Sequence, residues 1–236
     1  MTILSKKLFD YDDENFLIHA RDLFDIQILA KTLAYVNLKV AKCPTAFSEH
    51  GIGSDTLRMN SVLYELVSHV KDRKVFQGFP QYSYISYPPM IRRVRRKEDF
   101  VGWHQDLKYL KSARGLSLHA TCVTMFVPLN EIEIESPILE FYDNKNLHEL
   151  PHDETKQSQN SYRVPEFMLP QASIVRPKIA LGDALVFGDK TLHRTSTVGT
   201  GVTERVSIEF RFVKELELVS GKDYFCTRNM TLARQG

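Results

Sequence analysis

Residues 182–212 read GDALVFGDKTLHRTSTVGTGVTERVSIEFRF, and this stretch decides the fold class. Gly182 and Asp183 are turn residues, and the apolar run Ala184–Phe187 that follows them predicts a short buried strand. Further on, Val206–Val213 predicts a second strand, because apolar and polar residues alternate along it. The apolar set is Val206, Ile208, Phe210 and Phe212, and the polar set is Arg205, Ser207, Glu209 and Arg211. Taken alone, the polar set is explained by a solvent-facing edge strand, whereas an interior polar face would need a function.

Short segments rich in Tyr, Ile, Val, Phe and Thr lie on the N-terminal side of this stretch. Separated by turn residues, they predict four more strands, at Tyr82–Tyr87, Ile91–Arg95, Thr121–Leu129 and Ile138–Tyr142. Because no helical pattern lies between them, a sandwich or jelly roll is favoured over a parallel α/β sheet. Two helices are expected earlier, where apolar residues recur at three- and four-residue spacing, at Leu23–Ala34 and Ser54–Val70. The predicted fold class is mainly β with flanking α-helices.

A single domain is expected to span residues 1–236, since the chain has no internal repeat and no linker rich in Gly, Ser or Pro. Within it, residues 1–80 are expected to form a helix-rich N-terminal flank and residues 81–213 the β core. The polar stretch at 143–160, DNKNLHELPHDETKQSQN, has no core-forming pattern. We interpret it as a loop that is inserted between strands and acts as a lid.

The composition predicts a globular, cytoplasmic protein. Hydrophobic residues make up 43% of the 236 and charged residues 25%, which excludes disorder and coiled coil as descriptions of the whole. A formal charge of +2 gives no support to a nucleic-acid partner, and no apolar run is long enough to span a membrane. The three cysteines are widely spaced without a CxxC pair, so neither a disulfide framework nor a cysteine zinc site is indicated, and a reducing compartment fits best.

A His-x-Asp motif lies in the sequence WHQD at 103–106. Residues i and i+2 of an extended segment point to the same side, so His104 and Asp106 can converge on one metal ion. A His-x-Asp also occurs often by chance, for example on a polar strand edge. His193 follows the strand Ala184–Phe187, at the position where the next strand is expected.

Taken together, these segments resemble the Fe(II)/2-oxoglutarate-dependent dioxygenases, most of all their phytanoyl-CoA dioxygenase-like branch. The matches are WHQD at 103–106, GDALVF ahead of LHRT at 192–195, and Arg205 with Ser207 in the last predicted strand. The stretch TCVTMFVPLN at 121–130 is similar to the strand that follows the first ligands in that branch. The resemblance covers about residues 80–213 and implies a cupin-like jelly roll of the double-stranded β-helix type.

The resemblance implies that His104, Asp106 and His193 hold Fe(II). Imidazole and carboxylate ligands suit this ion, and a facial triad leaves positions open for a co-substrate and O₂. It also implies that 2-oxoglutarate is the co-substrate, with Arg205 holding its distal carboxylate and Ser207 donating a hydroxyl hydrogen bond to it. Arginine suits that role because its guanidinium binds a carboxylate through two hydrogen bonds and stays charged. The implied reaction is oxidation, usually hydroxylation, of a small molecule of specialised metabolism, with release of succinate and CO₂.

Two other classes of function remain open from the sequence. Arg205 and Arg211 form an R-x5-R pair that resembles the end of the alkylated-nucleobase demethylases of the same superfamily. Six residues of strand span about 20 Å, so both arginines cannot hold one carboxylate, and the nearly balanced charge does not favour a nucleic-acid substrate. The second class is a non-oxidative jelly-roll binding protein or isomerase, which has no need of Arg205 and Ser207 beside a metal triad.

Two further motifs carry competing explanations. In the basic run before the metal motif, Arg93 and Arg95 are candidates to bind an anionic group of the substrate, and a solvated strand face is the other explanation. Residues 148–152 spell HExxH, which is a zinc signature when it lies on a helix. Pro151 interrupts any such helix, so no zinc site is expected there.

Overall fold

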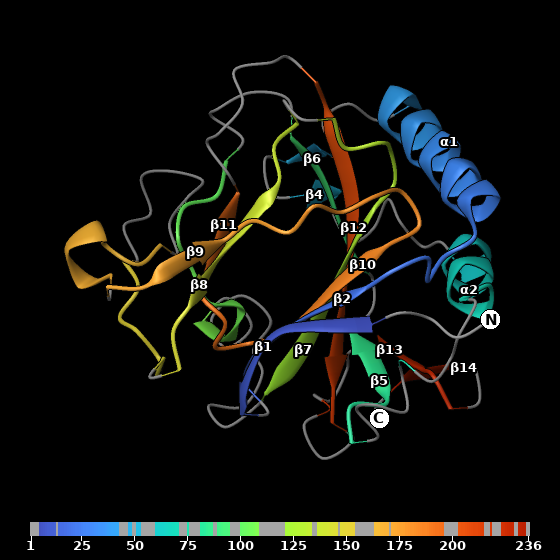
Figure 1. Cartoon of the computed structure of the whole chain (residues 1–236). Helices are drawn as coiled ribbons and strands as arrows, with labels where there is room; N and C mark the ends of the chain where they lie inside the picture. The colour runs from blue at the N-terminus through green and yellow to red at the C-terminus, as the bar shows by residue number, and fades with distance from the viewer. Residues whose placement is uncertain are drawn as a thin grey trace.

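The computed structural model (Figure 1) shows a mainly antiparallel β protein with few helices. It describes residues 5–12, 14–42, 47–48, 51–52, 60–70, 75, 81–86, 89–94, 100–108, 121–133, 136–145, 147–153, 163–169, 171–195, 203–214, 218, 223–228 and 231–234. In these residues no helix is long and apolar enough to cross a membrane.

Nine strands of the described chain form the main sheet, in the order β1-β2-β10-β7-β12-β5-β13-β14, with β6 also paired to β12. Their bounds are β1 Ser5–Asp12, β2 Asn15–Ala20, β5 Tyr84–Ser86, β6 Met90–Val94, β7 Cys122–Pro128, β10 Ala184–Gly188, β12 Arg205–Val213, β13 Asp223–Cys226 and β14 Thr231–Arg234. All neighbouring pairs are antiparallel. The segments expected to be strands are therefore present here as β5, β6, β7, β10 and β12.

A three-stranded sheet packs against the main sheet and consists of β11 (His193–Thr195), β8 (Leu139–Asp143) and β9 (Ser173–Val175), in that order. Buried apolar side chains from both sheets form an inner core: Leu17, Phe126, Leu185 and Phe187 of the main sheet, and Leu139 and Phe141 of β8. The remaining elements are the hairpin β3 Phe47–Ser48 and β4 Gly51–Ile52, the helices α1 Ile26–Lys42 and α2 Asn60–Ser68, and the 3-10 turn η3 Glu166–Met168.

The two α-helices lie together on one side of the main sheet (Figure 1). Their apolar residues join side chains of β7, β10 and β12 in an outer core, to which the helices contribute Ile28, Leu29, Val36, Leu66 and Val67. The carboxylate of Asp25 accepts a hydrogen bond from the backbone N–H of Gln27 (2.7 Å), which satisfies one amide at the start of α1. Both expected helices are present, with α1 extending beyond the expected Ala34 to Lys42.

Strand β12 has two chemically different faces, and all nine of its residues are buried. The apolar residues Val206, Ile208, Phe210 and Phe212 belong to the outer core under the helices. The polar residues Arg205, Ser207, Glu209 and Arg211 lie on the opposite face, because successive side chains of a strand alternate. On that face Glu209 is directly opposite Phe126 of β7, a residue of the inner core. The solvent-facing explanation of the polar set is therefore wrong, and the polar face of β12 lines the interior.

The N-terminal flank contains strands that the sequence patterns did not reveal. β2 lies between β1 and β10 within the main sheet. Phe16 packs into the outer core and Leu17 into the inner core, so β2 is buried on both faces. A strand buried on both faces has a continuous apolar run without the alternation that marks a half-buried strand. The flank therefore consists of more than helices, and β13 and β14 extend the sheet beyond residue 213.

Asp189, in the turn after β10, is a buried carboxyl group. Its Oδ2 accepts a hydrogen bond from the backbone N–H of Cys122 (2.8 Å), whereas its Oδ1 has no hydrogen-bond partner among the described residues. Burial raises the pKa of Asp189 to about 7. The ionised form is therefore disfavoured in the folded protein.

We expect Asp189→Asn to stabilise the protein at alkaline pH. Because the pKa is higher in the folded chain than the value of about 3.9 in an unfolded chain, the stability that this group contributes is present below about pH 4 and is lost as the pH rises through about 7. Asparagine mimics the neutral acid, so the free energy of unfolding in urea at about pH 8 should rise by at least about 1 kcal/mol. Identical pH profiles of stability for both proteins would contradict this account.

Candidate metal centre

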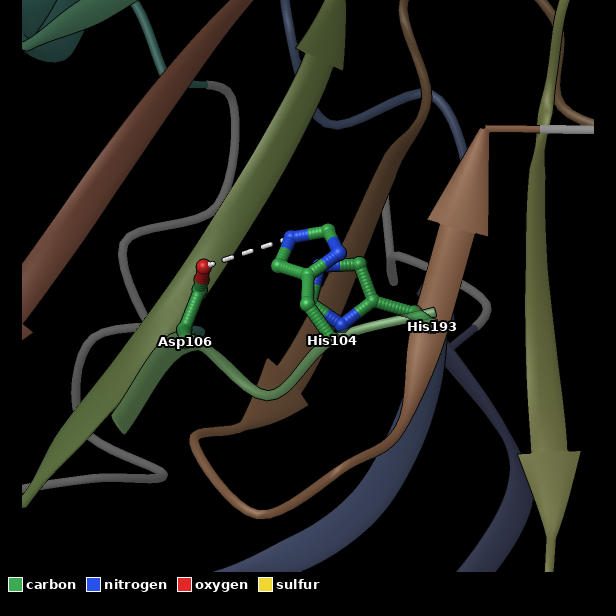
Figure 2. A group of neighbouring side chains, drawn as sticks. All are labelled: His104, Asp106 and His193. Carbon is green, nitrogen blue, oxygen red and sulfur yellow. Dashed lines mark ion pairs between the residues drawn. The ribbon is translucent and has the colours of Figure 1, made fainter. Parts of the chain in front are cut away.

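His104 and His193 lie side by side because their backbones pair. The N–H of each residue donates a hydrogen bond to the C=O of the other, with N···O distances of 2.9 and 3.0 Å. Residues directly opposite each other in an antiparallel pair have side chains on the same side. The ring centroids are accordingly 4.2 Å apart. Figure 2 shows Asp106 beside the two rings.

Asp106 completes a buried group of three side chains. It begins a helical turn at 106–108 rather than continuing the extended segment that the sequence predicted. One ligand atom from each of the three residues lies within 4.8 Å of the other two, and His104 Nε2 is 3.9 Å from Asp106 Oδ1. Across the described ranges, this is the one group of three or more His, Cys, Asp or Glu residues that could hold a metal ion.

Both histidines are held with Nε2 available as a ligand. Nδ1 of His104 lies 2.8 Å from the carbonyl oxygen of Gly102, and Nδ1 of His193 lies 2.9 Å from that of Thr191. A carbonyl oxygen can only accept, so each Nδ1 carries the proton and each Nε2 has a free lone pair. Burial is the main cause that lowers the pKa of both rings. The neutral imidazole that results is the form that binds a metal ion.

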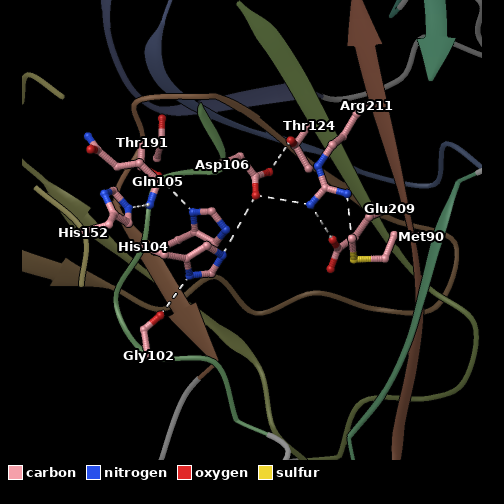
Figure 3. A network of polar contacts seen from close by, with 11 residues as sticks. Met90, Gly102, His104, Gln105, Asp106, Thr124, His152, Thr191, Glu209 and Arg211 are labelled. Carbon is pink, nitrogen blue, oxygen red and sulfur yellow. Dashed lines mark hydrogen bonds and ion pairs between the residues drawn. The ribbon is translucent and has the colours of Figure 1, made fainter. Parts of the chain in front are cut away.

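The carboxylate of Asp106 is held from two sides (Figure 3). Thr124 Oγ1 of β7 donates to Oδ2 (2.5 Å), and Arg211 Nη2 of β12 donates to Oδ1 (3.2 Å). Arg211 also donates to Glu209 (3.2 Å) and lies 3.8 Å from the sulfur of Met90. Burial alone would raise the pKa of Asp106, but the positive charge of Arg211, the two histidines and the Thr124 hydrogen bond outweigh it and hold this pKa below its usual range.

Gln105, which lies between His104 and Asp106 in the WHQD motif, connects three segments of the chain. Its side-chain amide donates to the carbonyl oxygens of His148 (2.9 Å) and Lys190 (2.7 Å), and its Oε1 accepts from the N–H of Leu150 (2.8 Å). Its backbone N–H donates to Nε2 of His152 (3.0 Å). Lys190 precedes His193 by three residues. Gln105 therefore holds the loop at 147–153 and the turn before His193 against the segment that carries His104 and Asp106.

The HExxH residues do not lie on a helix, which agrees with the interruption expected from Pro151. Residues 147–153 contain no helix. His152 Nδ1 lies 2.8 Å from the carbonyl oxygen of Leu150, and its Nε2 accepts from Gln105, so both ring nitrogens are engaged. Residues 154–160 of the expected lid lie outside the described residues, and the lid role stays a prediction.

Arg205 and Ser207 are completely buried on the polar face of β12. Arg205 Nη1 donates to the carbonyl oxygen of Pro137 (3.1 Å), and its guanidinium lies 5.3 Å from the ring centre of Phe126. Arg205 Nε, Arg205 Nη2 and Ser207 Oγ have no hydrogen-bond partner among the described residues. Burial, followed by the charge of Arg92, lowers the pKa of Arg205 to about 9, so its side chain remains charged at neutral pH.

The structure does not bring Arg93 to this group. Arg93 forms an ion pair with Glu204 and donates to the side chain of Asn37 on α1 (2.8 Å). It lies opposite Val206, a residue of the outer core, and so belongs to the helix side of the sheet. Arg95, the other candidate for an anionic substrate group, lies outside the described residues.

Three contributors to this site were not assigned from the sequence. Thr124 and Gln105 carry no local signal, because their roles depend on segments that meet only after folding. Arg211 was noticed for its R-x5-R spacing with Arg205, but its contact with Asp106 could not be anticipated. The alternating polar face of β12 was the one available signal, since Arg211 lies on the same face as Arg205.

Solved structures resemble the chain, although no protein-family model and no curated protein sequence matches it. The non-heme, alpha-ketoglutarate-dependent carbocyclase SnoK from nogalamycin biosynthesis gives a TM-score of 0.64 at 12% identity, over 92% of this chain and 83% of SnoK. The epimerase SnoN, solved with Fe³⁺, alpha ketoglutarate and nogalamycin RO, gives 0.57 at 16% identity, over 86% and 80%. AviO1 from Streptomyces viridochromogenes Tue57 gives 0.53 at 12% identity, over 88% and 93%.

The chain has the fold of these proteins. Two of them are named as enzymes that depend on alpha ketoglutarate, which is 2-oxoglutarate. At this level of identity the likeness shows the fold alone. The chemistry of the site therefore rests on the geometry of this chain, and the phytanoyl-CoA dioxygenase-like branch stays a prediction.

We expect Arg211→Gln to weaken divalent metal binding by about tenfold or more, because the partner that orients the candidate ligand Asp106 is lost. A calorimetric titration of each protein with Mn(II) measures this affinity. Arg176→Gln is the matched control, since Arg176 is also ion-paired, but with Glu140 and not with one of the three candidate ligands. Equal Mn(II) affinity in Arg211→Gln and wild type would contradict a positioning role.

We expect Gln105→Met to lower the free energy of unfolding by about 2–4 kcal/mol, since buried partners of its side chain lose their hydrogen bonds while the side-chain volume is nearly kept. Urea unfolding without metal measures the loss. Gln27→Met on the exposed side of α1 is the control and should change stability by less than about 0.5 kcal/mol. A Gln105→Met protein as stable as this control would show that the bridging bonds contribute nothing.

Proposed function

We propose that this protein is an Fe(II)- and 2-oxoglutarate-dependent oxygenase that hydroxylates a small molecule, with O₂ as oxidant. We assign its two facing sheets to the jelly roll of the double-stranded β-helix type. From its sequence motifs we assign it to the phytanoyl-CoA dioxygenase-like branch. One observation carries the proposal. The three candidate metal ligands and Arg205, whose charge has no carboxylate partner in the described chain, are buried in the same interior.

The donor set of the triad fits Fe(II). His104 and His193 offer neutral Nε2 atoms, and Asp106 offers a carboxylate held ionised by Arg211. Two imidazoles and one carboxylate, with further positions open, are typical of non-heme Fe(II) oxygenases. A closed structural zinc site would instead use four protein ligands. The three ligands found in the described chain therefore favour a catalytic ion.

The orphaned donors on β12 fit the co-substrate. Arg205 keeps two nitrogen atoms and Ser207 one hydroxyl without partners, although both residues are fully buried. Buried polar groups of native proteins are almost always paired, so such orphans indicate a ligand. A carboxylate satisfies all three, since guanidinium binds it bidentately and a hydroxyl donates a further bond. We assign this role to the distal carboxylate of 2-oxoglutarate.

The other residues of the interior hold this arrangement and exclude water. Thr124 and Arg211 fix the carboxylate of Asp106, and the carbonyl groups of Gly102 and Thr191 fix the two imidazole rings. The rings of Phe187 and Phe141, with centroids 4.7 and 5.8 Å from that of His193, form an apolar wall beside it. When bound, iron and 2-oxoglutarate supply the oxidation of a C–H bond, coupled to the formation of succinate and CO₂.

A small molecule of specialised metabolism is the proposed substrate class. This choice is supported by the fold shared with SnoK and SnoN, which are named for nogalamycin biosynthesis. Those names are carbocyclase and epimerase, so hydroxylation is our choice among the oxidative outcomes that this fold serves. Cys122 and Cys226 are buried free thiols, which supports the proposed cytoplasmic location.

Succinate formation tests this proposal directly. With Fe(II), 2-oxoglutarate and ascorbate, wild type should release succinate, and Asp106→Ala should fall to the background without enzyme because a ligand is missing. Anaerobic calorimetry of the Mn(II)-loaded protein should show that Arg205→Met binds 2-oxoglutarate at least about tenfold more weakly than wild type, since charge-assisted hydrogen bonds are lost.

The same variant has a readout that is independent of catalysis. Without ligands, Arg205→Met should be at least as stable as wild type, because a buried charge without a carboxylate partner is removed. If wild type fails to bind 2-oxoglutarate, or Asp106→Ala releases succinate equally, the oxygenase proposal is wrong.

A further inference from the structure

Arg92 of β6 faces the same interior as Arg205. In the pairing of β6 with β12, Arg92 lies directly opposite Ser207, and Met90 lies opposite Glu209. Directly opposite residues share a face, so Arg92 points to the polar side of β12. Met90 lies two residues before Arg92, on the same face of β6, and its contact with Arg211 shows that this face points to the polar side of β12.

Arg92 is a diagonal neighbour of Arg205, which corresponds to a Cβ separation of about 7 Å. The positive charge of Arg92 contributes to the lowered pKa of both Arg205 and His104, although burial is the larger cause for each residue. Arg92 is therefore close enough to Arg205 and to His104 for its charge to act on both. No carboxylate in the described part of the chain forms an ion pair with Arg92, and Glu209 on the same wall is paired with Arg211.

The charges of this wall do not balance without a further anion. Among the described residues, three arginines, Arg92, Arg205 and Arg211, share this wall with two carboxylates, those of Asp106 and Glu209. A divalent metal ion and the dianion of 2-oxoglutarate neutralise each other, so one positive charge remains. Arg205 is fully buried, whereas Arg92 keeps part of its surface exposed. The remaining charge thus lies at the position that a molecule from solvent can reach.

We propose that Arg92 binds an anionic group, a carboxylate or phosphate, of the primary substrate. This inference rests on the proposed function and names its substrate class as anionic. A guanidinium pairs with either group bidentately, and a partly desolvated pair contributes both affinity and orientation. Arg92 is accordingly a specificity residue, and it takes the role for which the sequence had suggested Arg93 and Arg95.

The test uses inorganic sulfate as the probe, at constant ionic strength, on protein loaded with Mn(II) and saturated with 2-oxoglutarate without oxygen. Calorimetry should show saturable sulfate binding to wild type. Arg92→Gln should bind sulfate at least about tenfold more weakly. Arg92→Lys, which keeps the charge, should remain within about fivefold of wild type. Arg93→Gln is the matched control on the other face and should bind sulfate as wild type does.

The 2-oxoglutarate titration of the same variants separates the two sources of a carboxylate. Arg92→Gln should bind 2-oxoglutarate within about threefold of wild type; a loss as large as that of Arg205→Met would assign Arg92 to the co-substrate and overturn the proposal. Absence of saturable sulfate binding to wild type, or equal binding to Arg92→Gln, would also overturn it. Failure of wild type to bind 2-oxoglutarate would instead refute the proposed function, and sulfate titration of the Mn(II) protein alone would still decide whether Arg92 binds anions.

Discussion

The paired backbone hydrogen bonds between His104 and His193 are the contact on which the site depends. They join the WHQD segment to β11 and align two imidazoles whose sequence positions are far apart. Gln105 reinforces this joint through the carbonyl oxygen of Lys190, just before β11. Because directly opposite residues of an antiparallel pair present side chains on the same side, the backbone itself sets where the two candidate metal ligands lie. The side-chain contacts then orient the rings and the carboxylate within that frame.

The alternating side chains of β12 serve two purposes: one face packs in the core, and the other lines the candidate site. One face contributes Phe210 and its apolar neighbours to the outer core, and the other presents Arg205 and Arg211 to the interior. Burying arginine is unfavourable unless its charge and donors are matched. Arg211 is matched by Asp106 and Glu209, whereas Arg205 is not matched by any carboxylate in the described chain. Buried hydrogen-bond donors without partners, such as those of Arg205, are typical of a ligand site.

The arginines on the two faces of the main sheet have different electrostatic roles. Arg211 stabilises the ionised form of Asp106, a proposed metal ligand, and Arg205 has unpaired hydrogen-bond donors. Arg93 instead forms an ion pair with Glu204 on the helix side of the sheet. These residues are equivalent in charge and similar in sequence setting. Their separation follows from strand pairing and from the alternation of side chains across the sheet, which places neighbouring residues of β6 on opposite faces.

The sequence is enough to predict the mainly β character, both helices, the strands with alternating patterns and the candidate ligands His104, Asp106 and His193, because these follow from local periodicity and from motifs. It could not reveal β2, whose burial on both faces removes the alternation. The folded structure was needed to show that the polar face of β12 is interior, that Arg211 and Thr124 hold Asp106, and that Arg92 rather than Arg93 faces the site. The physical reason is that these facts depend on which strands pair and in which register, and register arises from contacts between segments distant in the chain.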